Sequence, residues 1–600
     1  MQFTLLNGKI SSFCGDIVPL YFDFPVKFQN KLANADISWS YEGDAIYIRE
    51  FSGEDKTNFN NGVLVILKKA GNATVRAVYD GKEYVCEVEV REPKAVSSDE
   101  PLNYYFADMH DHTMYTHNHE ECIVRESEFQ IDYINQLKDE GLMDASVISD
   151  HAGVINDTEF FRGFVADEKS EPKSVVILPG AESEITYVKE DRFGIKRRLS
   201  GEIVTLNAEG YLPKKSWEEF ENEFSETPEP IGIFAHPTIS GFSTPGLWNF
   251  DFANHNTEGI RRIMRGVELG SGEDQDECLI YEYAYSDALD AGFKLSPTCS
   301  SDSHGPVWGY YKIPGKTVIM AKEKSREAFV DALRNNRFYA TESGNVKLRY
   351  SVNGKFAPCE LLPCDKYVFK VYLDCFKEDK TTKPCICKVI SDGGVSLKTI
   401  ENFGSEFEFE IESSSARYFY LRLSDSEGRR TWSMPVFTGR QFDEKKNASL
   451  SPVSTEKMSA SERFTGKDAA SLVDGNPHNF WMGEEKTASL LIDMGECRDI
   501  SALGICQRIV EHNYKDDWRS TDYTAGFPFE IEIHTGIDGV NFKRQKAACL
   551  RAFGSEEIIS FEKHSARYVL FEVKSTVGSY SGFKKYADAP VAIGNIALFE

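Results

Sequence analysis

Alternating apolar and polar residues fill the first 95 positions of the chain. Runs such as NATVRAVYD and EYVCEVEV place apolar residues at every second position, and Gly, Asn and Asp interrupt them. An alternation of period two is typical of half-buried strands, and short strands at this spacing indicate a β-sandwich. We therefore expect residues 1–95 to form a β-sandwich.

The pattern changes between residues 101 and 343. Short apolar runs (ASVISD, VVILPGAE, IGIFAHP) alternate there with helical stretches such as ESEFQIDYINQLKDEG and SREAFVDALRNN. Strand–helix alternation predicts an α/β domain with a parallel sheet, either a barrel or a doubly wound sheet. Period-two patterns return afterwards, so residues 346–440 are predicted to form a small β-sandwich and residues 452–600 a further all-β unit.

Composition and charge narrow the classes of partner. The formal net charge is −27, from 95 acidic and 68 basic residues, which argues against a nucleic-acid polymer because phosphate binding needs Lys and Arg. No stretch reaches the roughly 18 apolar residues of a membrane span. Thirteen cysteines without a regular frame and no secretion signal favour the cytoplasm. An extracellular location stays open if a leader has been removed.

Histidines and carboxylates recur where predicted strands run out into loops. Eight of the 12 histidines fall between residues 110 and 304, and the candidates that follow apolar runs are His110, His112, Asp150, His151, Glu182, His236, Asp302 and His304. The i, i+2 spacing of His110 and His112 puts both imidazoles on one face of a strand. In an α/β barrel the carboxyl ends of the strands share one mouth, and these ligand types suit Zn, Mn or Fe.

The order HxH, DH, GxE, HP, DxH over about 240 residues resembles the PHP (polymerase and histidinol phosphatase) family of metal-dependent hydrolases. This resemblance implies a distorted (β/α)7 barrel that holds two or three divalent transition-metal ions. Glu182 matches the carboxylate that bridges two of them. The implied ligands are His110, His112, His117, His151, Glu182, Glu202, His236, Asp302 and His304.

Two positions depart from the family pattern. Thr116-His117-Asn118 stands where many members have Ser-Asp-Gly, and Glu202 stands where a histidine is usual. His117 would ligate in place of the aspartate. A carboxylate at position 202 favours Mn or Fe over Zn at that ion.

Further candidate site residues lie beside these motifs in the sequence. Asp108, Asp150 and Glu268 are expected to orient ligand imidazoles, whereas Arg261, Arg262 and Arg265 either meet an anionic substrate group or form a solvated helix face. The block from GKTVIM to YSVNG, with ARYFYLRLSDSEGRRTWSMPVF, resembles the PHP subfamily that includes carbamate-ester hydrolases.

The terminal β units also resemble known modules. Residues 1–95 resemble a bacterial immunoglobulin-like module. SASERFTGKDAASLVDGNPHNFWMG, SLLIDMGECRDISALGI and IGNIALFE resemble a discoidin-type (coagulation factor type C) jelly roll, a class that often binds carbohydrate. By that resemblance Asp474 and Asn479 would hold a structural Ca²⁺, with Asn595 in the place of a usual glutamate, while Trp518 and Arg519, near His512 and Tyr514, would contact a sugar.

The predicted architecture is therefore multidomain, α/β plus all-β, with a PHP barrel flanked by immunoglobulin-like β-sandwiches and a discoidin-like jelly roll. The predicted function is a metal-dependent phosphoesterase that uses a metal-bound hydroxide on a phosphate mono- or diester, including a sugar-linked one. Asp302 and His304 are the candidates for proton transfer. A carboxylic-ester or carbamate hydrolase on the same site is the first alternative, and a non-enzymatic glycan-binding protein is the second.

Overall fold

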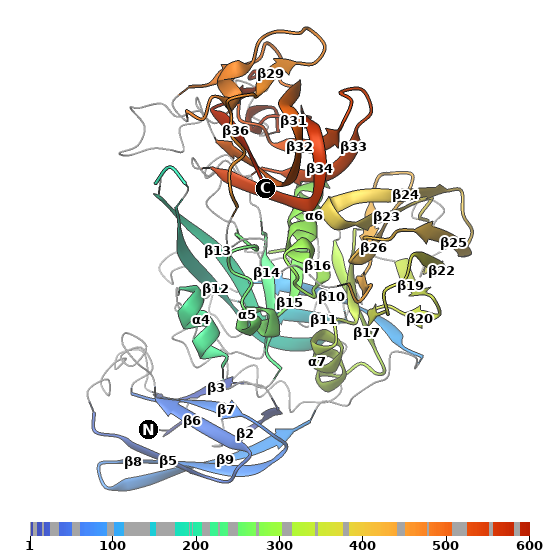
Figure 1. The fold of residues 1–600 in the computed structure, drawn as a ribbon. Helices are drawn as coiled ribbons and strands as arrows, with labels where there is room; N and C mark the ends of the chain where they lie inside the picture. Colours follow the sequence, from blue (N-terminus) through green and yellow to red (C-terminus); the bar gives the residue numbers. More distant parts are fainter. Residues whose placement is uncertain are drawn as a thin grey trace.

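A computed structural model gives the arrangement of most of the 600 residues. The N-terminal sheets, the central domain and the C-terminal sheets follow one another along the molecule, and the third unit lies beside the centre (Figure 1). The residues that the structure describes are 2–3, 9–14, 17–23, 35–50, 61–92, 101–112, 144–149, 151, 175–190, 192–194, 196–206, 216–225, 229–237, 250–271, 275–302, 315–342, 346–375, 383–440, 450–476, 479–506, 525–550, 556–580 and 588–600.

The N-terminal unit consists of two facing sheets, of orders β2-β9-β8-β5 and β3-β7-β6, with a small β1–β4 pair. Its strands enclose one apolar core that includes Leu20, Val65 and Val75, as expected for a sandwich with one buried face on each sheet. The strands are β1 (Gln2–Phe3), β2 (Lys9–Phe13), β3 (Ile17–Leu20), β4 (Phe22–Asp23), β5 (Ser38–Glu42), β6 (Ile46–Glu50), β7 (Val63–Leu67), β8 (Gly71–Tyr79) and β9 (Lys82–Arg91).

The central domain is built on a run of neighbouring strands. The sheet keeps the chain order from β10 to β16, and β17 and β18 extend it beyond β10. Its strands are β10 (Asn103–Asp111), β11 (Ala145–Ile148), β12 (Val176–Glu190), β13 (Lys196–Leu206), β14 (Ile231–Ala235), β15 (Met264–Ser271), β16 (Ser296–Ser300), β17 (Lys316–Ala321) and β18 (Phe338–Thr341).

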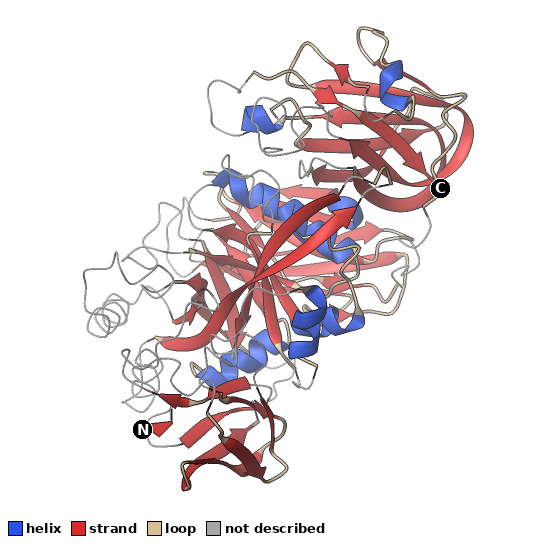
Figure 2. Ribbon diagram, turned by 90° about the vertical axis from the view of Figure 1, so that its left-hand side faces the viewer, coloured by secondary structure: helices blue, strands red, loops and turns tan. Residues whose placement is uncertain are grey.

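The expectation of a distorted (β/α)7 barrel is not supported by the described part of this sheet. β10–β11–β12 and β14–β15–β16 are parallel, but β13 runs antiparallel to both of its neighbours. The physical reason lies in residues 180–206, which alternate apolar and polar positions without a helical period and fold as a long hairpin around a turn at residues 192–194. The sheet is mixed, and strands outweigh helices throughout the molecule (Figure 2).

The two ends of the seven-stranded run approach each other. The backbone N–H of Asp302, just after β16, donates to the carbonyl of His110 in β10, at 2.8 Å. The sheet therefore curls so that the carboxyl ends of its first and last strands meet. This curl brings residues nearly 200 positions apart in sequence to one point.

Four described helices accompany these strands: α4 (Trp217–Glu223), α5 (Glu258–Ile263), α6 (Gln275–Asp290) and α7 (Arg326–Arg334). α4 begins with a capping box in which Ser216 and Glu219 satisfy each other's backbone N–H groups. Thr257 and Ser325 cap α5 and α7 through their side chains. No helix in the described ranges is long and apolar enough to cross a membrane.

The third unit shares hydrogen bonds with the central sheet. β18 pairs with β27, and the sheet continues through β26, β23 and β24, so the ladder crosses the predicted boundary at residues 343–346. A separate sheet has the order β20-β19-β22-β25. The strands are β19 (Val346–Val352), β20 (Lys355–Phe356), β21 (Cys359–Glu360), β22 (Lys366–Cys375), β23 (Ile386–Ser391), β24 (Val395–Glu401), β25 (Glu406–Glu412), β26 (Tyr418–Ser424), β27 (Arg430–Trp432) and β28 (Val436–Phe437), with the 3₁₀ turn η5 (Asp392–Gly394).

Over its described residues, the C-terminal unit is all-β apart from two short turns of helix. Long strands β31 and β34 shift register where they pair, which bends the sheet over a core that includes Leu490, Ile533 and Phe571. The elements are β29 (Ser459–Glu462), η7 (Ala470–Val473), β30 (Trp481–Met482), β31 (Ala488–Cys506), β32 (Glu530–Gly536), β33 (Lys543–Cys549), β34 (Glu557–Val573), α9 (Val577–Tyr580), β35 (Ala592–Ile593) and β36 (Asn595–Phe599).

Candidate metal centre

The curled sheet gathers predicted ligands from six of its strands. They are His110 and His112 at the end of β10, His151 after β11, Glu182 and Glu202 in β12 and β13, His236 directly after β14, and Asp302 after β16. Except for His151, Glu202 and Asp302, these residues are buried, with at most 3% of their surface exposed. Residues that the sequence places far apart therefore form one cluster.

The carboxylate of Glu182 lies at the centre of this cluster. Its Oε1 lies 3.3 Å from His110 Nε2 and 3.0 Å from His236 Nε2. Its Oε2 lies 3.3 Å from His112 Nε2 and 3.0 Å from His151 Nε2. Each oxygen thus faces its own pair of imidazoles, which is the arrangement of a carboxylate shared between two cations.

Asp302 adds a third set of ligand atoms. Its Oδ1 lies 3.4 Å from His110 Nε2 and 3.1 Å from His112 Nε2, and those two nitrogens are 3.0 Å apart. Around a tetrahedral ion with bonds of about 2.0–2.1 Å, neighbouring ligand atoms lie roughly 3.3 Å apart. The spacing therefore fits ligand atoms that converge on shared ions, and the residues present suit Zn²⁺, Mn²⁺ or Fe²⁺.

Glu202 points into the same cluster. Its Oε2 lies 3.3 Å from His236 Nε2, and Glu202 pairs with Ala235 of β14 in the sheet. This register puts its side chain on the side of the imidazoles, where the sequence prediction placed it. Its ligand role, like those of the other cluster residues, stays a prediction.

Attraction between the imidazoles and the carboxylates dominates the electrostatics of the cluster. Burial alone would lower the pKa of His236, but the carboxylates of Glu182, Asp302 and Glu202 raise it to about 10. For His112, burial is likewise outweighed by Asp302 and Glu182, and its pKa is about 9. Burial raises the pKa of Glu202 to about 8, helped by the negative charge of Glu182. The imidazoles and the carboxylates around Glu182 therefore favour each other's charged forms, while burial and Glu182 favour the neutral form of Glu202.

Two cluster residues have unusual backbone conformations. His236 has φ of 23° and Asp302 has φ of 50°, values that residues with a Cβ rarely adopt. Such conformations cost free energy and concentrate at functional sites. Both residues follow the last strand residue closely, so the left-handed turn aims their side chains back toward the cluster.

Asp108 and Glu268 hold the strand ends in place. Asp108 Oδ1 accepts hydrogen bonds from the N–H groups of His110, at 3.3 Å, and Ser301, at 2.9 Å. Glu268 Oε2 accepts from the N–H of His236 at 2.6 Å, and its Oε1 lies 3.5 Å from His110 Nδ1. These contacts agree with the orienting role predicted for both residues, which stays a prediction.

Sequence reasoning missed a buried polar layer beneath the imidazoles. Asp111 accepts hydrogen bonds from the hydroxyls of Ser146, at 2.5 Å, and Ser301, at 2.8 Å. It thereby ties β10 to β11 and to the segment after β16. The one available signal was a charged residue between His110 and His112, at a position that strand periodicity turns to the opposite face.

Several predicted residues lie outside the described ranges. These are His117, Asp150 and His304 in the central domain and His512, Tyr514, Trp518 and Arg519 in the C-terminal unit. Their predicted roles are untested.

The arginines predicted to meet substrate contact backbone carbonyls. Arg261 donates to the carbonyl of Asn256 at 2.7 Å. Arg265 donates to the carbonyls of Met264, at 2.9 Å, and Arg334, at 3.2 Å. These contacts lie around α5 and the start of β15, whereas Glu268 of the cluster lies further along that strand. The two predicted alternatives for these arginines, a substrate contact and a solvated helix face, stay predictions.

The residues predicted to hold Ca²⁺ lie together in the C-terminal unit. The Asn479 amide donates to Asp474 Oδ2, and the Asn595 amide lies 3.5 Å from Asp474 Oδ1. Asn595 is buried. The three side chains supply the oxygen ligands that Ca²⁺ prefers, so the predicted calcium site stays a prediction with a suitable set of neighbours.

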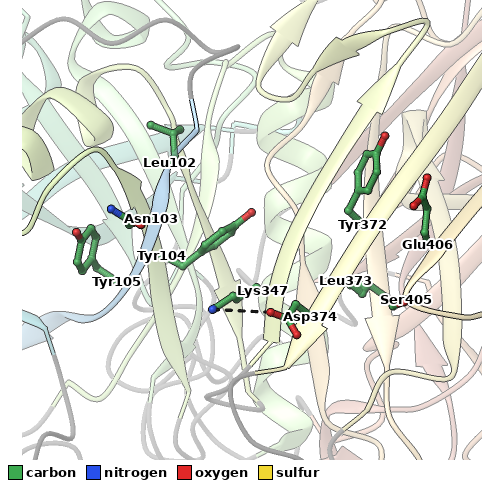
Figure 3. Close-up of a pocket in the computed structure, with 10 residues that line it drawn as sticks. All are labelled: Leu102, Asn103, Tyr104, Tyr105, Lys347, Tyr372, Leu373, Asp374, Ser405 and Glu406. Carbon is green, nitrogen blue, oxygen red and sulfur yellow. Dashed lines mark ion pairs between the residues drawn. The ribbon is translucent and has the colours of Figure 1, made fainter.

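A cavity of about 700 Å³ lies elsewhere, between the start of β10 and strands β19, β22 and β25. Tyr104 and Tyr372 come from its two sides, and Lys347 pairs with Asp374 at 3.8 Å (Figure 3). It shares no lining residue with the histidine cluster. The cavity is thus distinct from the candidate metal centre.

Comparison with known proteins gives structural neighbours only. No protein-family model matches the chain, and no curated protein matches it. Similar solved structures include CpGH89CBM32-5 from Clostridium perfringens in complex with GalNAc-beta-1,3-galactose, and the family 32 carbohydrate-binding module of C. perfringens NanJ in complex with galactose. Each is 19% identical, covers 25% of this chain and 100% of its own, and has a TM-score of 0.20.

A third neighbour is CBM32-3 from a family 31 glycoside hydrolase of C. perfringens. It is 17% identical, covers 25% of this chain and 94% of its own, and has a TM-score of 0.19. These neighbours are carbohydrate-binding modules of the discoidin-like class, the kind of domain predicted for residues 452–600. At such TM-scores the likeness by itself decides nothing about what this chain binds.

Proposed function

We propose that this protein is a metal-dependent hydrolase of the PHP type, with its active site at the histidine–carboxylate cluster. One observation carries the proposal: the two oxygens of Glu182 face two different pairs of imidazoles at 3.0–3.3 Å. A buried set of imidazoles and carboxylates is costly for a fold to maintain unless it binds a ligand.

Divalent ions in this centre would lower the pKa of a bound water and polarise the substrate's oxygen. The chain's own residues would hold the ions and orient the ligand side chains. Positive charge at the site keeps Asp302 ionised: the protonated histidines, against the opposing effect of burial, hold its pKa at about 2, and bound cations would supply that charge in place of histidines that become neutral on ligation. Such a carboxylate suits a metal ligand better than a proton acceptor, which works best with a pKa near the operating pH. Glu268 and Asp108 would keep the imidazoles aimed at the ions.

The first substrate class is a phosphate mono- or diester, including a sugar-linked one, and the resemblance to the PHP family supports it. A carboxylic ester or carbamate is the alternative on the same site, supported by the subfamily resemblance of residues 315–354. Elemental analysis of protein purified without chelator should find two or three transition-metal ions per chain. A panel of phosphomonoester, phosphodiester, carboxyl-ester and carbamate substrates should show turnover that a chelator abolishes and Zn²⁺ or Mn²⁺ restores. Protein with neither metal nor turnover would refute the proposal.

A second candidate function belongs to the C-terminal unit. Its sequence resembles discoidin-type domains, and the neighbouring structures include modules in complex with galactose and GalNAc-beta-1,3-galactose. We propose carbohydrate binding there. A glycan array with the full chain should give signals for galactose-containing glycans, and their absence would reject this function while leaving the hydrolase untouched.

A further inference from the structure

The hairpin of β12 and β13 reaches well beyond the sheet that it belongs to. β14 pairs with β13 only over residues 202–206, and β11 pairs with β12 only over residues 176–179. In the described ranges, residues 185–190 and 196–201 pair only with each other. A ribbon of two strands is marginally stable by itself, so beyond Ile185 and Tyr187, which pack in the central core, its orientation depends on what holds its far end.

The cluster ligands lie at the root of this ribbon. Glu202 is the first residue of β13 that pairs with β14, and Glu182 of β12 lies two residues from Glu184, which pairs with Glu202. The adjoining Gly201 packs so closely under the ring of Phe250 that a Cβ there would lie 2.5 Å from Phe250 Cε1. A tilt of the ribbon would therefore act on Glu202 first.

The tip of the ribbon is held by the C-terminal unit. Arg192 Nε lies 2.9 and 2.8 Å from the two carboxylate oxygens of Glu556, whose side chain is 1% exposed. The Arg192 guanidinium also lies over the rings of Phe193, at 4.1 Å, and Phe599, at 5.9 Å. Figure 1 shows the ribbon rising from the central domain toward the C-terminal sheets. The contact joins the tip to the C-terminal sheet through a buried charge.

A second contact fixes the C-terminal unit itself. Lys546 of β33 is buried and pairs with Asp287, at 2.5 Å, and Asp290, at 2.6 Å. Both carboxylates lie in the last turn of α6, which has no basic residue of its own. Acidic groups at that end of a helix oppose its dipole, so α6 needs a cation from elsewhere. The C-terminal unit is thus anchored to the central domain at two separate points.

We propose that Arg192 is a positioning residue for Glu202, and that the C-terminal unit is a fixed part of the metal-binding unit rather than a tethered accessory. The inference rests on the proposed function, because a displacement of Glu202 affects function only if Glu202 ligates an ion. Loss of the Arg192 guanidinium leaves the buried Glu556 carboxylate unpaired and releases the ribbon. Glu202 Oε2, 3.3 Å from His236 Nε2, then loses its fixed place at the ion it shares with His236.

The experiment compares full-length Arg192→Met, Arg192→Lys and Arg567→Met. Arg567 pairs with Asp493 at 2.9 and 3.0 Å within the C-terminal unit, so its variant is the matched control. Competition with a chromophoric chelator should show the most weakly held ion bound about 2- to 30-fold less tightly in Arg192→Met, a range typical of residues that touch no ligand. The Co²⁺-substituted protein should change its absorption spectrum. Arg192→Lys should recover most of both properties, and Arg567→Met should match wild type.

Hydrogen exchange on metal-free protein separates this inference from the proposed function. Arg192→Met should speed exchange of the amides in residues 200–204, whether or not the cluster binds metal. If wild type binds no metal, the proposed function fails and the exchange result decides the inference. If wild type binds metal and Arg192→Met matches it in both affinity and exchange, the inference is overturned and the proposed function stands.

Discussion

Four imidazoles surround the carboxylate of Glu182, and this arrangement shifts the pKa values of residues in the cluster. Burial would raise the pKa of Glu182, but the surrounding histidines hold it well below its usual range. The same attraction raises the pKa of His110 well above its usual value despite burial. Each group is charged because its neighbours are, so a change at one position alters the charge state of the others.

Glu182→Gln should remove most bound metal and hydrolytic activity with little change in the thermal midpoint. An amide keeps the shape of the side chain but gives up the negative charge that two ions would share. Glu184→Gln is the matched control, because Glu184 lies two residues along the same strand and accepts a hydrogen bond from Ser200 at 2.7 Å. Elemental analysis and turnover measure the outcome. Full metal content in Glu182→Gln would contradict the bridging role.

Glu202→His should shift the metal preference of the centre toward Zn²⁺. A carboxylate is a harder ligand than an imidazole and favours Mn²⁺ or Fe²⁺, and Glu202 lies beside His236 in the structure. Activity after reconstitution with each metal, in wild type and variant, gives the ranking. Identical rankings in the two proteins would show that Glu202 ligates no ion.

Among the secondary-structure elements, the β12–β13 hairpin has the largest effect on the site. Its strands carry Glu182 and Glu202, and its apolar side packs in the central core through Ile185 and Tyr187. Gly201 is the point of closest packing, with Phe250 over its backbone. The hairpin therefore needs a small residue immediately before Glu202.

Gly201→Ala should destabilise the protein by about 1–3 kcal/mol, the usual cost of overpacking a core. The displacement of the backbone by the added Cβ should also weaken metal binding, because Glu202 is the next residue. Gly404→Ala is the control, since a Cβ at Gly404 would meet only the Glu406 carbonyl, at 3.8 Å. Chemical denaturation and chelator competition report the two effects. Unchanged metal affinity in a destabilised Gly201→Ala would separate packing from ligand position.

At the scale of the whole molecule, buried ion pairs hold the units together. Lys546 bridges the C-terminal unit to α6, and Arg417 of the third unit also contacts Asp290, at 3.3 Å. Although burial opposes the charged form, Lys546 and Arg417 hold the pKa of Asp290 below its usual value. Three units thus meet at the last turn of one helix.

Lys546→Met should cost about 3–5 kcal/mol at pH 7, as expected when one partner of a buried pair is removed. A carboxyl group with a lowered pKa stabilises the fold above its unfolded value of 3.8 and loses that contribution as the pH falls through the folded value. The difference in thermal midpoint between wild type and variant should therefore shrink below about pH 4. Lys574→Met, which removes a half-exposed lysine paired with Glu572, should show a small difference at every pH. A Lys546→Met difference that stays constant with pH would contradict the assignment.

The sequence by itself determined the local features. Period-two patterns gave the β units at both ends, because strand periodicity is set by backbone geometry alone. Apolar runs followed by His or Asp marked the strand ends from which His110, His112, His236 and Asp302 now converge, whereas Glu182, also predicted at a strand end, lies within the longer β12. Candidate ligand types also needed no structure, since they follow from side-chain chemistry.

Only the tertiary structure decided how these pieces combine. The antiparallel course of β13 and the sheet that continues into the third unit depend on long-range strand pairing, which local periodicity leaves undetermined. The side of the strand from which Glu202 points follows from its register against β14. The contacts of Arg192 with Glu556 and of Lys546 with α6 join residues more than 250 positions apart. A sequence does not distinguish a charged residue on the surface from one in a buried ion pair, because the fold decides which charges meet.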